Sequence, residues 1–163
     1  MKTICVRNVH QALPEGLRLL DTYGEKQSSR AGDVITVDFP VCTSYIFPQE
    51  RVLFHPQRDA NPYLHFFESL WMIAGRRDVE FVSQFTKNIS KYSDDGKVFH
   101  GAYGYRWRIH FELDQLLVII EHLRRYPSSR RAVLQMWDCD YDLHIDSSDK
   151  RDLPCNLIIT FRN

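Results

Sequence analysis

Residues 61–75 read NPYLHFFESLWMIAG, and this stretch carries the clearest signal for regular structure in the chain. Asn61 is a favourable N-cap, and the proline after it suits the first helical position. Apolar side chains recur at Leu64, Phe67 and Trp71 with the spacing of one helix face, and a glycine follows as a stop signal. The pattern predicts a helix over the whole stretch.

The flanking segments give further helices and strands by their apolar periodicity. Helices are predicted over residues 9–24, 78–90 and 113–125, strands over residues 34–39, 41–47, 132–137 and 157–161, and loops over residues 27–33, 91–101 and 138–152. The last of these loops is rich in aspartate and is expected to be exposed. Helices mixed with strands that are not adjacent in sequence predict an α+β fold.

The composition excludes several classes of protein. With 163 residues, 44% of them hydrophobic, the chain is long enough to bury one core. Lys plus Arg and Asp plus Glu number 21 each, so there is no general attraction to nucleic acid or to a membrane surface. No apolar run approaches the roughly 20 residues of a spanning helix, and no signal peptide is visible. We therefore expect a cytoplasmic protein.

The cysteines are predicted to be free thiols, which are usually buried and inert. Cys5, Cys42, Cys139 and Cys155 are far apart in sequence and form no CxxC pair, which disfavours a disulfide framework or a zinc ribbon. Cys155 follows Leu-Pro where a polar loop enters an apolar strand. From the residues alone it is either a structural thiol or, if nearby cations or dipoles lower its pKa, a nucleophile.

Charged residues near the apolar segments also have two interpretations. Glu68 lies beside the apolar stripe of its helix, so its carboxyl either moves protons at the edge of a core or faces water. Arg130 and Arg131 lie between a helix and a strand, where paired guanidinium groups either bind phosphate oxygens or remain solvated. Residues 101–108, GAYGYRWR, suggest tight backbone geometry beside a flat ligand, although such strings also pack ordinary cores.

The order of the motifs is more informative than any one of them. Arg-x-Gly, Glu-x-Leu-Trp, Tyr-Gly-x-x-Trp-Arg, Asp-Gln, Ser-Arg-Arg and Leu-Pro-Cys follow one another along the chain. In order and approximate spacing, residues 30–163 resemble the thymidylate synthases and the related nucleotide hydroxymethylases. The resemblance is most specific at Asp114-Gln115, at Ser129-Arg130-Arg131 and at Pro154-Cys155. It implies a layered α+β fold in which helices pack on a mixed β-sheet.

The resemblance also implies catalytic roles. Cys155 matches the nucleophile that adds to C6 of a pyrimidine nucleotide, after which C5 attacks the one-carbon unit of the co-substrate 5,10-methylenetetrahydrofolate. Glu68 matches a glutamate that organises water and moves protons, and Tyr103 matches a tyrosine that assists proton removal. The implied chemistry uses no metal.

The implied binding residues come from two subunits. Arg30 matches an arginine that binds the nucleotide phosphate within its own subunit, whereas Arg130 and Arg131 match a pair donated to the partner's phosphate. The resemblance therefore implies a homodimer with a shared active site. Arg58 loosely matches a basic residue that faces the folate.

One departure from the synthase pattern bears on the product. Synthases carry a tryptophan that packs by the reactive methylene intermediate and favours hydride delivery, but no tryptophan lies between Trp71 and Trp107 here. That segment offers Phe85, Ile89 and Tyr92 instead. Capture of the intermediate by water, and hence hydroxymethyl transfer, becomes possible.

Three functions stay open at this point. The chain methylates dUMP to dTMP, or it hydroxymethylates dUMP or dCMP with water in place of hydride, or it is a non-catalytic nucleotide-binding fragment. The third arises because the family's second half, with its base-reading residues, is absent from residues 1–163. We expect these residues to form a single domain that is incomplete at its carboxy-terminal end.

Overall fold

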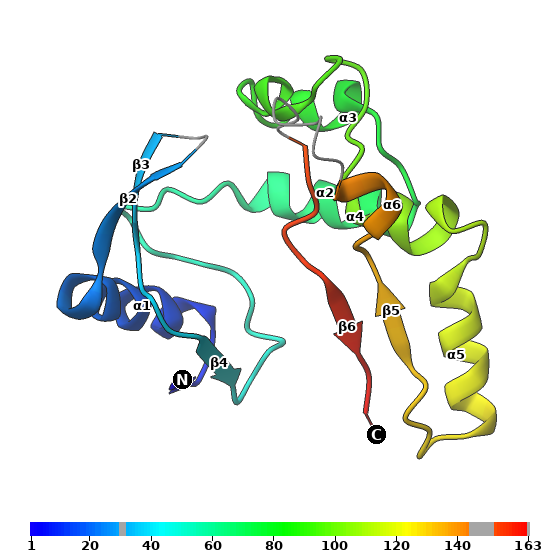
Figure 1. Cartoon of the computed structure of the whole chain (residues 1–163), viewed down its shortest axis with the longest axis horizontal. Helices are drawn as coiled ribbons and strands as arrows, with labels where there is room; N and C mark the ends of the chain where they lie inside the picture. Colours follow the sequence, from blue (N-terminus) through cyan, green and yellow to red (C-terminus); the bar gives the residue numbers. More distant parts are fainter. Residues whose placement is uncertain (30–31, 144–151, 163) are drawn as a thin grey trace. The chain divides into compact units, whose positions relative to one another are not determined.

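The computed structural model describes residues 1–29, 32–143 and 152–162, and its helices and strands confirm the predicted α+β class (Figure 1). The chain divides into two units, Met1–Pro62 and Tyr63–Asn163, which are described in turn. Membership of both units in one domain stays a prediction. None of the helices in the described ranges is long and apolar enough to cross a membrane.

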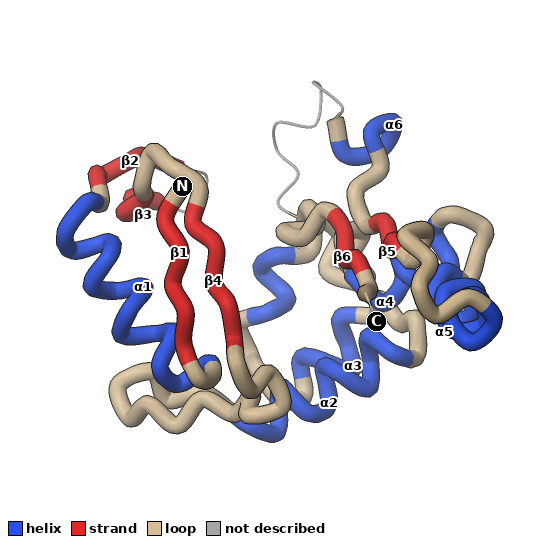
Figure 2. Tube along the Cα trace, turned by 90° about the horizontal axis from the view of Figure 1, so that it is seen from below, coloured by secondary structure: helices blue, strands red, loops and turns tan. Residues whose placement is uncertain are grey.

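The first unit pairs its strands in two small sheets. Its elements are β1 (Lys2–Val6), α1 (Val9–Tyr23), β2 (Glu25–Ser29), β3 (Gly32–Thr36) and β4 (Val41–Tyr45). Strands β1 and β4 lie side by side (Figure 2) and are parallel, and β2 and β3 are antiparallel. The predicted first helix is confirmed, and the Asn8 side chain caps it by accepting the N–H of Gln11 at 3.2 Å. Strand β1 was not predicted, and β2 occupies part of the predicted turn.

The second unit contains most of the helix that was predicted over residues 61–75. Its elements are α2 (Pro62–Ile73), α3 (Val79–Ser83), η1 (Ile89–Tyr92), α4 (Tyr103–Tyr105), η2 (Arg106–His110), α5 (Gln115–Arg125), β5 (Val133–Gln135), α6 (Cys139–Asp142) and β6 (Ile158–Thr160). Strands β5 and β6 form an antiparallel pair, and α5 packs beside β5 (Figure 1). The sheets of the described ranges are thus separate two-stranded pairs, both parallel and antiparallel.

The predicted helix over residues 78–90 is wrong beyond its first turns. Asp78 caps α3 by accepting the N–H of Phe81, but α3 ends at Ser83, and η1 is a separate 3-10 turn. Between them Phe85 turns inward and stacks on Phe67 of α2, with the ring centroids 4.4 Å apart. The ring of Phe85 therefore packs on α2, and α3 does not continue through this residue.

Two apolar clusters form the core of this unit. One contains Trp71, Val79, Val82, Phe99 and Ala102, and the other contains Ile119, Ala132, Leu134 and Met136. The α4–η2 segment connects them, because Tyr105 packs on the first cluster while Tyr103 and Trp107 pack on the second. Gly104 permits this path, since an added Cβ would lie 1.9 Å from the carbonyl oxygen of Met72.

The expectation of an exposed loop over residues 138–152 is wrong at its start. Asp138 caps the short helix α6, and Asp142 in that helix is buried. Both carboxylate oxygens of Asp142 accept from the guanidinium of Arg106, at 2.8 and 3.1 Å. Residues 144–151 lie outside the described residues.

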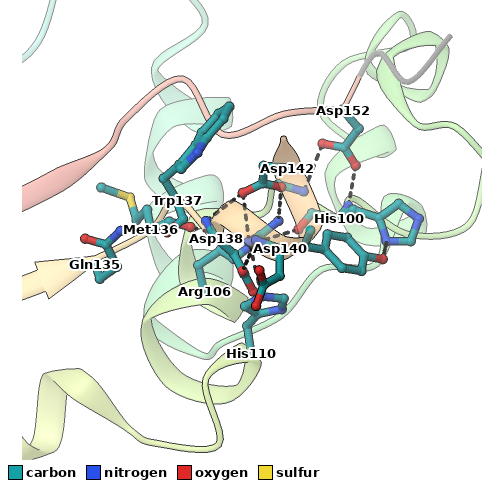
Figure 3. Close-up of polar contacts among 12 residues, drawn as sticks. His100, Arg106, His110, Gln135, Met136, Trp137, Asp138, Asp140, Asp142 and Asp152 are labelled. Carbon is teal, nitrogen blue, oxygen red and sulfur yellow. Dashed lines mark hydrogen bonds and ion pairs between the residues drawn. The ribbon is translucent and has the colours of Figure 1, made fainter. Parts of the chain in front are cut away.

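Arg106 is fully buried and joins three segments of the unit (Figure 3). Besides its ion pair with Asp142, its Nε donates to the carbonyl of His100 at 3.0 Å and its Nη1 donates to that of Met136 at 3.5 Å. A buried guanidinium is tolerated only when its charge and its N–H groups are matched in this way. The pair therefore fixes α6 and the His100 turn against the end of β5.

We predict that Asp142→Asn lowers the free energy of unfolding of this unit by about 3–5 kcal/mol, because it leaves the buried Arg106 charge unpaired. Urea unfolding followed by tryptophan fluorescence measures the effect, since Trp71, Trp107 and Trp137 all lie in the second unit. The control is Arg76→Gln, which removes the exposed pair with Asp78 and should cost about 1 kcal/mol or less. Equal losses in the two variants would contradict the prediction.

A second prediction concerns acid. The hydrogen bond with His110, at 2.6 Å, holds the pKa of Asp138 below its usual value. A depressed folded-state pKa contributes stability above the unfolded value of about 3.9, and that stability is lost as the pH falls through the folded pKa. Asp138→Asn should therefore destabilise the protein at neutral pH but little at about pH 2. Urea titrations at both pH values check this, and a deficit that is independent of pH would contradict it.

Candidate functional site

A pocket of about 370 Å³ in the second unit brings Glu68, Tyr103 and Cys155 together. Its other lining residues are Trp71, Met72, Val82, Ile89, Tyr92, Phe99, Gly101, Ala102, Asp152 and Leu153. Most of this wall is apolar, and a few polar groups converge on it, which is the usual composition of a small-molecule site. The volume falls in the range of such sites, roughly 300–1,000 Å³.

Helix geometry brings Glu68 to this pocket. Glu68 lies three residues before Trp71 in α2, and residues at that spacing share a helix face. Trp71 is buried in the first core cluster, and Glu68 is half-buried at the cluster's edge. The structure therefore places this carboxyl at the edge of a core, which is the first of the two interpretations of the sequence.

The Cys155 thiol is the nucleophile candidate of the pocket. All four cysteines are free thiols, but the expectation that they are buried is wrong, because all four are exposed. Cys155 alone among them lines this pocket. The preceding Pro154 is buried and anchors the backbone just before the thiol. Because its side chain is exposed and lines a pocket, Cys155 is not a cysteine buried in the core.

Tyr103 interacts electrostatically with the other two groups. Burial is the main cause that raises the pKa of its phenol, followed by its hydrogen bond with the Cys155 side chain and the charge of that side chain. The negative charge of Glu68 raises the pKa of Tyr103 further. The phenol therefore stays protonated at neutral pH and carries a proton beside the thiol and the carboxylate.

Asp152 is a pocket residue that the sequence interpretation did not single out. Its carboxylate accepts the backbone N–H groups of His100 and Gly101, the second at 3.1 Å. Burial is the main cause that raises its pKa, and these hydrogen bonds oppose the shift. No sequence motif marked it, because its role depends on the close approach at Gly101, where an added Cβ would lie 2.7 Å from the backbone nitrogen of Pro154.

The stretch without tryptophan contributes two side chains to the pocket. Ile89 and Tyr92 of η1 line it, whereas Phe85 is stacked on Phe67. The pocket wall therefore has an aliphatic side chain and a phenol in this region.

The paired arginines lie apart from the residues that line the pocket. Arg130 and Arg131 are exposed between α5 and β5. The hydroxyl of Ser129 accepts the N–H of Arg131 at 3.1 Å and lies 2.7 Å from Nε2 of His122, which fixes the turn. Their role toward a partner's phosphate stays a prediction.

The other two predicted binding residues, Arg58 and Arg30, are not among the residues of the second unit. Arg58 belongs to the first unit, where its N–H donates to the carbonyl of His55 at 3.0 Å. Arg30 lies outside the described residues. Both roles stay predictions. Within the described ranges, no group of His, Cys, Asp and Glu side chains is arranged to hold a metal ion.

Comparison with known proteins extends these observations. A sequence profile of the thymidylate synthase family matches residues 18–163. The deoxyuridylate hydroxymethyltransferase of Pseudomonas phage M6 is 52% identical over 162 residues, which are 99% of this chain and 45% of that protein. That of Bacillus phage SP01 is 36% identical over 133 residues, which are 76% of this chain and 34% of that protein.

A putative thymidylate synthase of Methanothermobacter marburgensis is 39% identical over 70 residues, covering 43% of this chain and 29% of that protein. The chain thus spans less than half the length of these curated relatives. Among solved structures, the thymidylate synthase from T4 phage is similar with a TM-score of 0.47 and 18% identity, over 62% of this chain and 40% of that one.

Proposed function

Because the chain belongs to the thymidylate synthase family, we propose that it takes part in transferring a one-carbon unit to C5 of deoxyuridylate through a covalent adduct on Cys155. The observation that carries the proposal is the pocket in which the thiol of Cys155, the carboxyl of Glu68 and the phenol of Tyr103 meet. A nucleophile with two proton-carrying groups beside it has the composition that covalent catalysis needs.

The proposed chemistry assigns one step to each group. The Cys155 thiolate adds to C6 of the pyrimidine, and the electron pair that this releases at C5 attacks the methylene carbon of 5,10-methylenetetrahydrofolate. Removal of the C5 proton, assisted by Tyr103, and proton movement through Glu68 release tetrahydrofolate and leave an exocyclic methylene at C5. Attack at this carbon and elimination of the thiolate complete the turnover.

We propose water as the attacking species, which gives the hydroxymethyl product. Oxygen adds to the exocyclic carbon, the water proton passes to a pocket base, and the folate leaves as tetrahydrofolate without redox change. The names of the phage relatives at 52% and 36% identity support this outcome, as does a wall formed by Ile89 and Tyr92. Methylation, in which hydride from the folate replaces water, is the alternative.

The binding assignments form part of the same proposal. Arg30 would bind the nucleotide phosphate within its subunit, Arg130 and Arg131 would reach the phosphate of a partner subunit, and Arg58 would face the folate. Guanidinium groups suit this purpose because their paired N–H donors match phosphate oxygens. A homodimer with a shared site follows from the assignment of Arg130 and Arg131.

We predict that 5-fluoro-dUMP with 5,10-methylenetetrahydrofolate forms a covalent adduct, because fluorine at C5 cannot leave as the proton does. Mass spectrometry of peptides should place the adduct on Cys155. Cys155→Ser should abolish it, whereas Cys139→Ser, which changes another exposed free thiol of the same unit, should leave it intact. An adduct that survives Cys155→Ser would refute the assignment.

The product distinguishes the two outcomes. With dUMP and 5,10-methylenetetrahydrofolate we expect 5-hydroxymethyl-dUMP and tetrahydrofolate, and in heavy-oxygen water the product should gain the label. Chromatography with mass spectrometry measures both compounds. Formation of dTMP and dihydrofolate in equal amounts, without label, would establish methylation instead.

A further inference from the structure

The backbone of His100 is held at both its N–H and its carbonyl (Figure 3). Its N–H donates to the carboxylate of Asp152, and its carbonyl accepts from Nε of Arg106 at 3.0 Å. Arg106 is fully buried and paired with the buried Asp142. The turn at His100 is therefore bound to a rigid element on one side and to the segment that carries Cys155 on the other.

The same segment also touches the turn through its backbone. Gly101 leaves no space for a side chain, because an added Cβ would lie 2.8 Å from the carbonyl carbon of Leu153 and 2.7 Å from the nitrogen of Pro154. Pro154 is buried against this contact, and the exposed Cys155 follows immediately. The position of the thiol thus depends on how closely residues 152–154 lie on the turn.

We propose that Asp152 is a positioning residue, which clamps residues 152–154 onto the His100–Gly101 turn and so sets the sulfur of Cys155 against Tyr103 and Glu68. The inference rests on the proposed function, in which Cys155 is the nucleophile. Nucleophilic addition is sensitive to such placement, because a displacement of about 1 Å can lower a rate by about a hundredfold.

The geometry explains why the clamp needs a carboxylate. Oδ2 of Asp152 accepts from His100 and Oδ1 accepts from Gly101, so each oxygen serves one N–H. Asparagine would supply one oxygen and an NH₂ group, which would face the second N–H as donor against donor. Asp152→Asn therefore breaks half of the clamp without changing the size of the side chain.

Asp95 offers a matched control in the same unit. Its carboxylate also binds two backbone N–H groups, those of Lys97 and Val98 at 2.7 and 2.9 Å, but both bonds go to Oδ1. Asparagine at that position keeps the single acceptor. The same substitution is thus expected to break the contact at Asp152 and to preserve it at Asp95, which lies outside the pocket lining.

The first test is the rate of adduct formation on Cys155 with saturating 5-fluoro-dUMP and 5,10-methylenetetrahydrofolate. We expect Asp152→Asn to slow it about a hundredfold with little change in the dissociation constant of dUMP, and Asp95→Asn to react at the wild-type rate. Gly101→Ala, which disturbs the other side of the same contact, should resemble Asp152→Asn. A wild-type rate in Asp152→Asn would overturn the inference, whereas absence of an adduct in the wild type would refute the proposed function instead.

The second test needs neither nucleotide nor folate. Alkylation of Cys155 by iodoacetamide is measured by peptide mass spectrometry relative to Cys139 in the same chain, in proteins whose circular dichroism is native. Tyr103→Phe should change this ratio in the wild type, where the clamp keeps the thiol next to the phenol. It should leave the ratio unchanged in the Asp152→Asn background, where the two groups are no longer held together. An equal effect of Tyr103→Phe in both backgrounds would overturn the inference.

Discussion

The second unit depends on a charge pair from which solvent is excluded. Arg106 and Asp142 are both buried, and their attraction has to offset the loss of hydration of two ions. A hydrophobic pair could stabilise a core as well, but it would not hold the carbonyl of His100. The guanidinium supplies directed donors, so the pair determines where the turn beside the pocket lies as well as contributing stability.

Backbone contacts that only glycine permits extend this order to the pocket. Gly104 allows α4 to cross α2 at Met72, and Gly101 allows residues 153–154 to lie on the turn. Helix α2 carries Glu68, α4 carries Tyr103, and the segment on the turn carries Cys155. Three groups that are distant in sequence therefore converge because main chains approach one another without intervening side chains.

The sequence predicted those features that depend on local periodicity. The helices α2 and α5 have apolar faces, Asp114 caps α5 by accepting the N–H of Leu117, and strands β5 and β6 follow from alternation. The missed features depend on distant partners. The pairing of β1 needs β4, and α3 ends where Phe85 stacks on Phe67.

Helix α6 shows the same limit most clearly. An aspartate-rich stretch reads as exposed because burial of a carboxylate is costly. Arg106, the partner that offsets this cost for Asp142, lies 36 residues earlier in the chain. The candidate site divides in the same way: motif order indicated Cys155, Glu68 and Tyr103, whereas Asp152 becomes visible only through the turn that it binds.

A carboxylate in a pocket with a nucleophilic thiol has an electrostatic cost, because a negative charge disfavours formation of the thiolate. The contacts of Asp152 limit that cost, because each of its oxygens accepts a backbone N–H and part of the charge is compensated locally. Burial raises the pKa of Asp152, and these two hydrogen bonds oppose that shift because they favour the ionised form. On the other side of the thiol, the Tyr103 phenol remains a proton donor. The pocket can therefore use a carboxylate to hold the Cys155 segment while a neutral donor faces the sulfur.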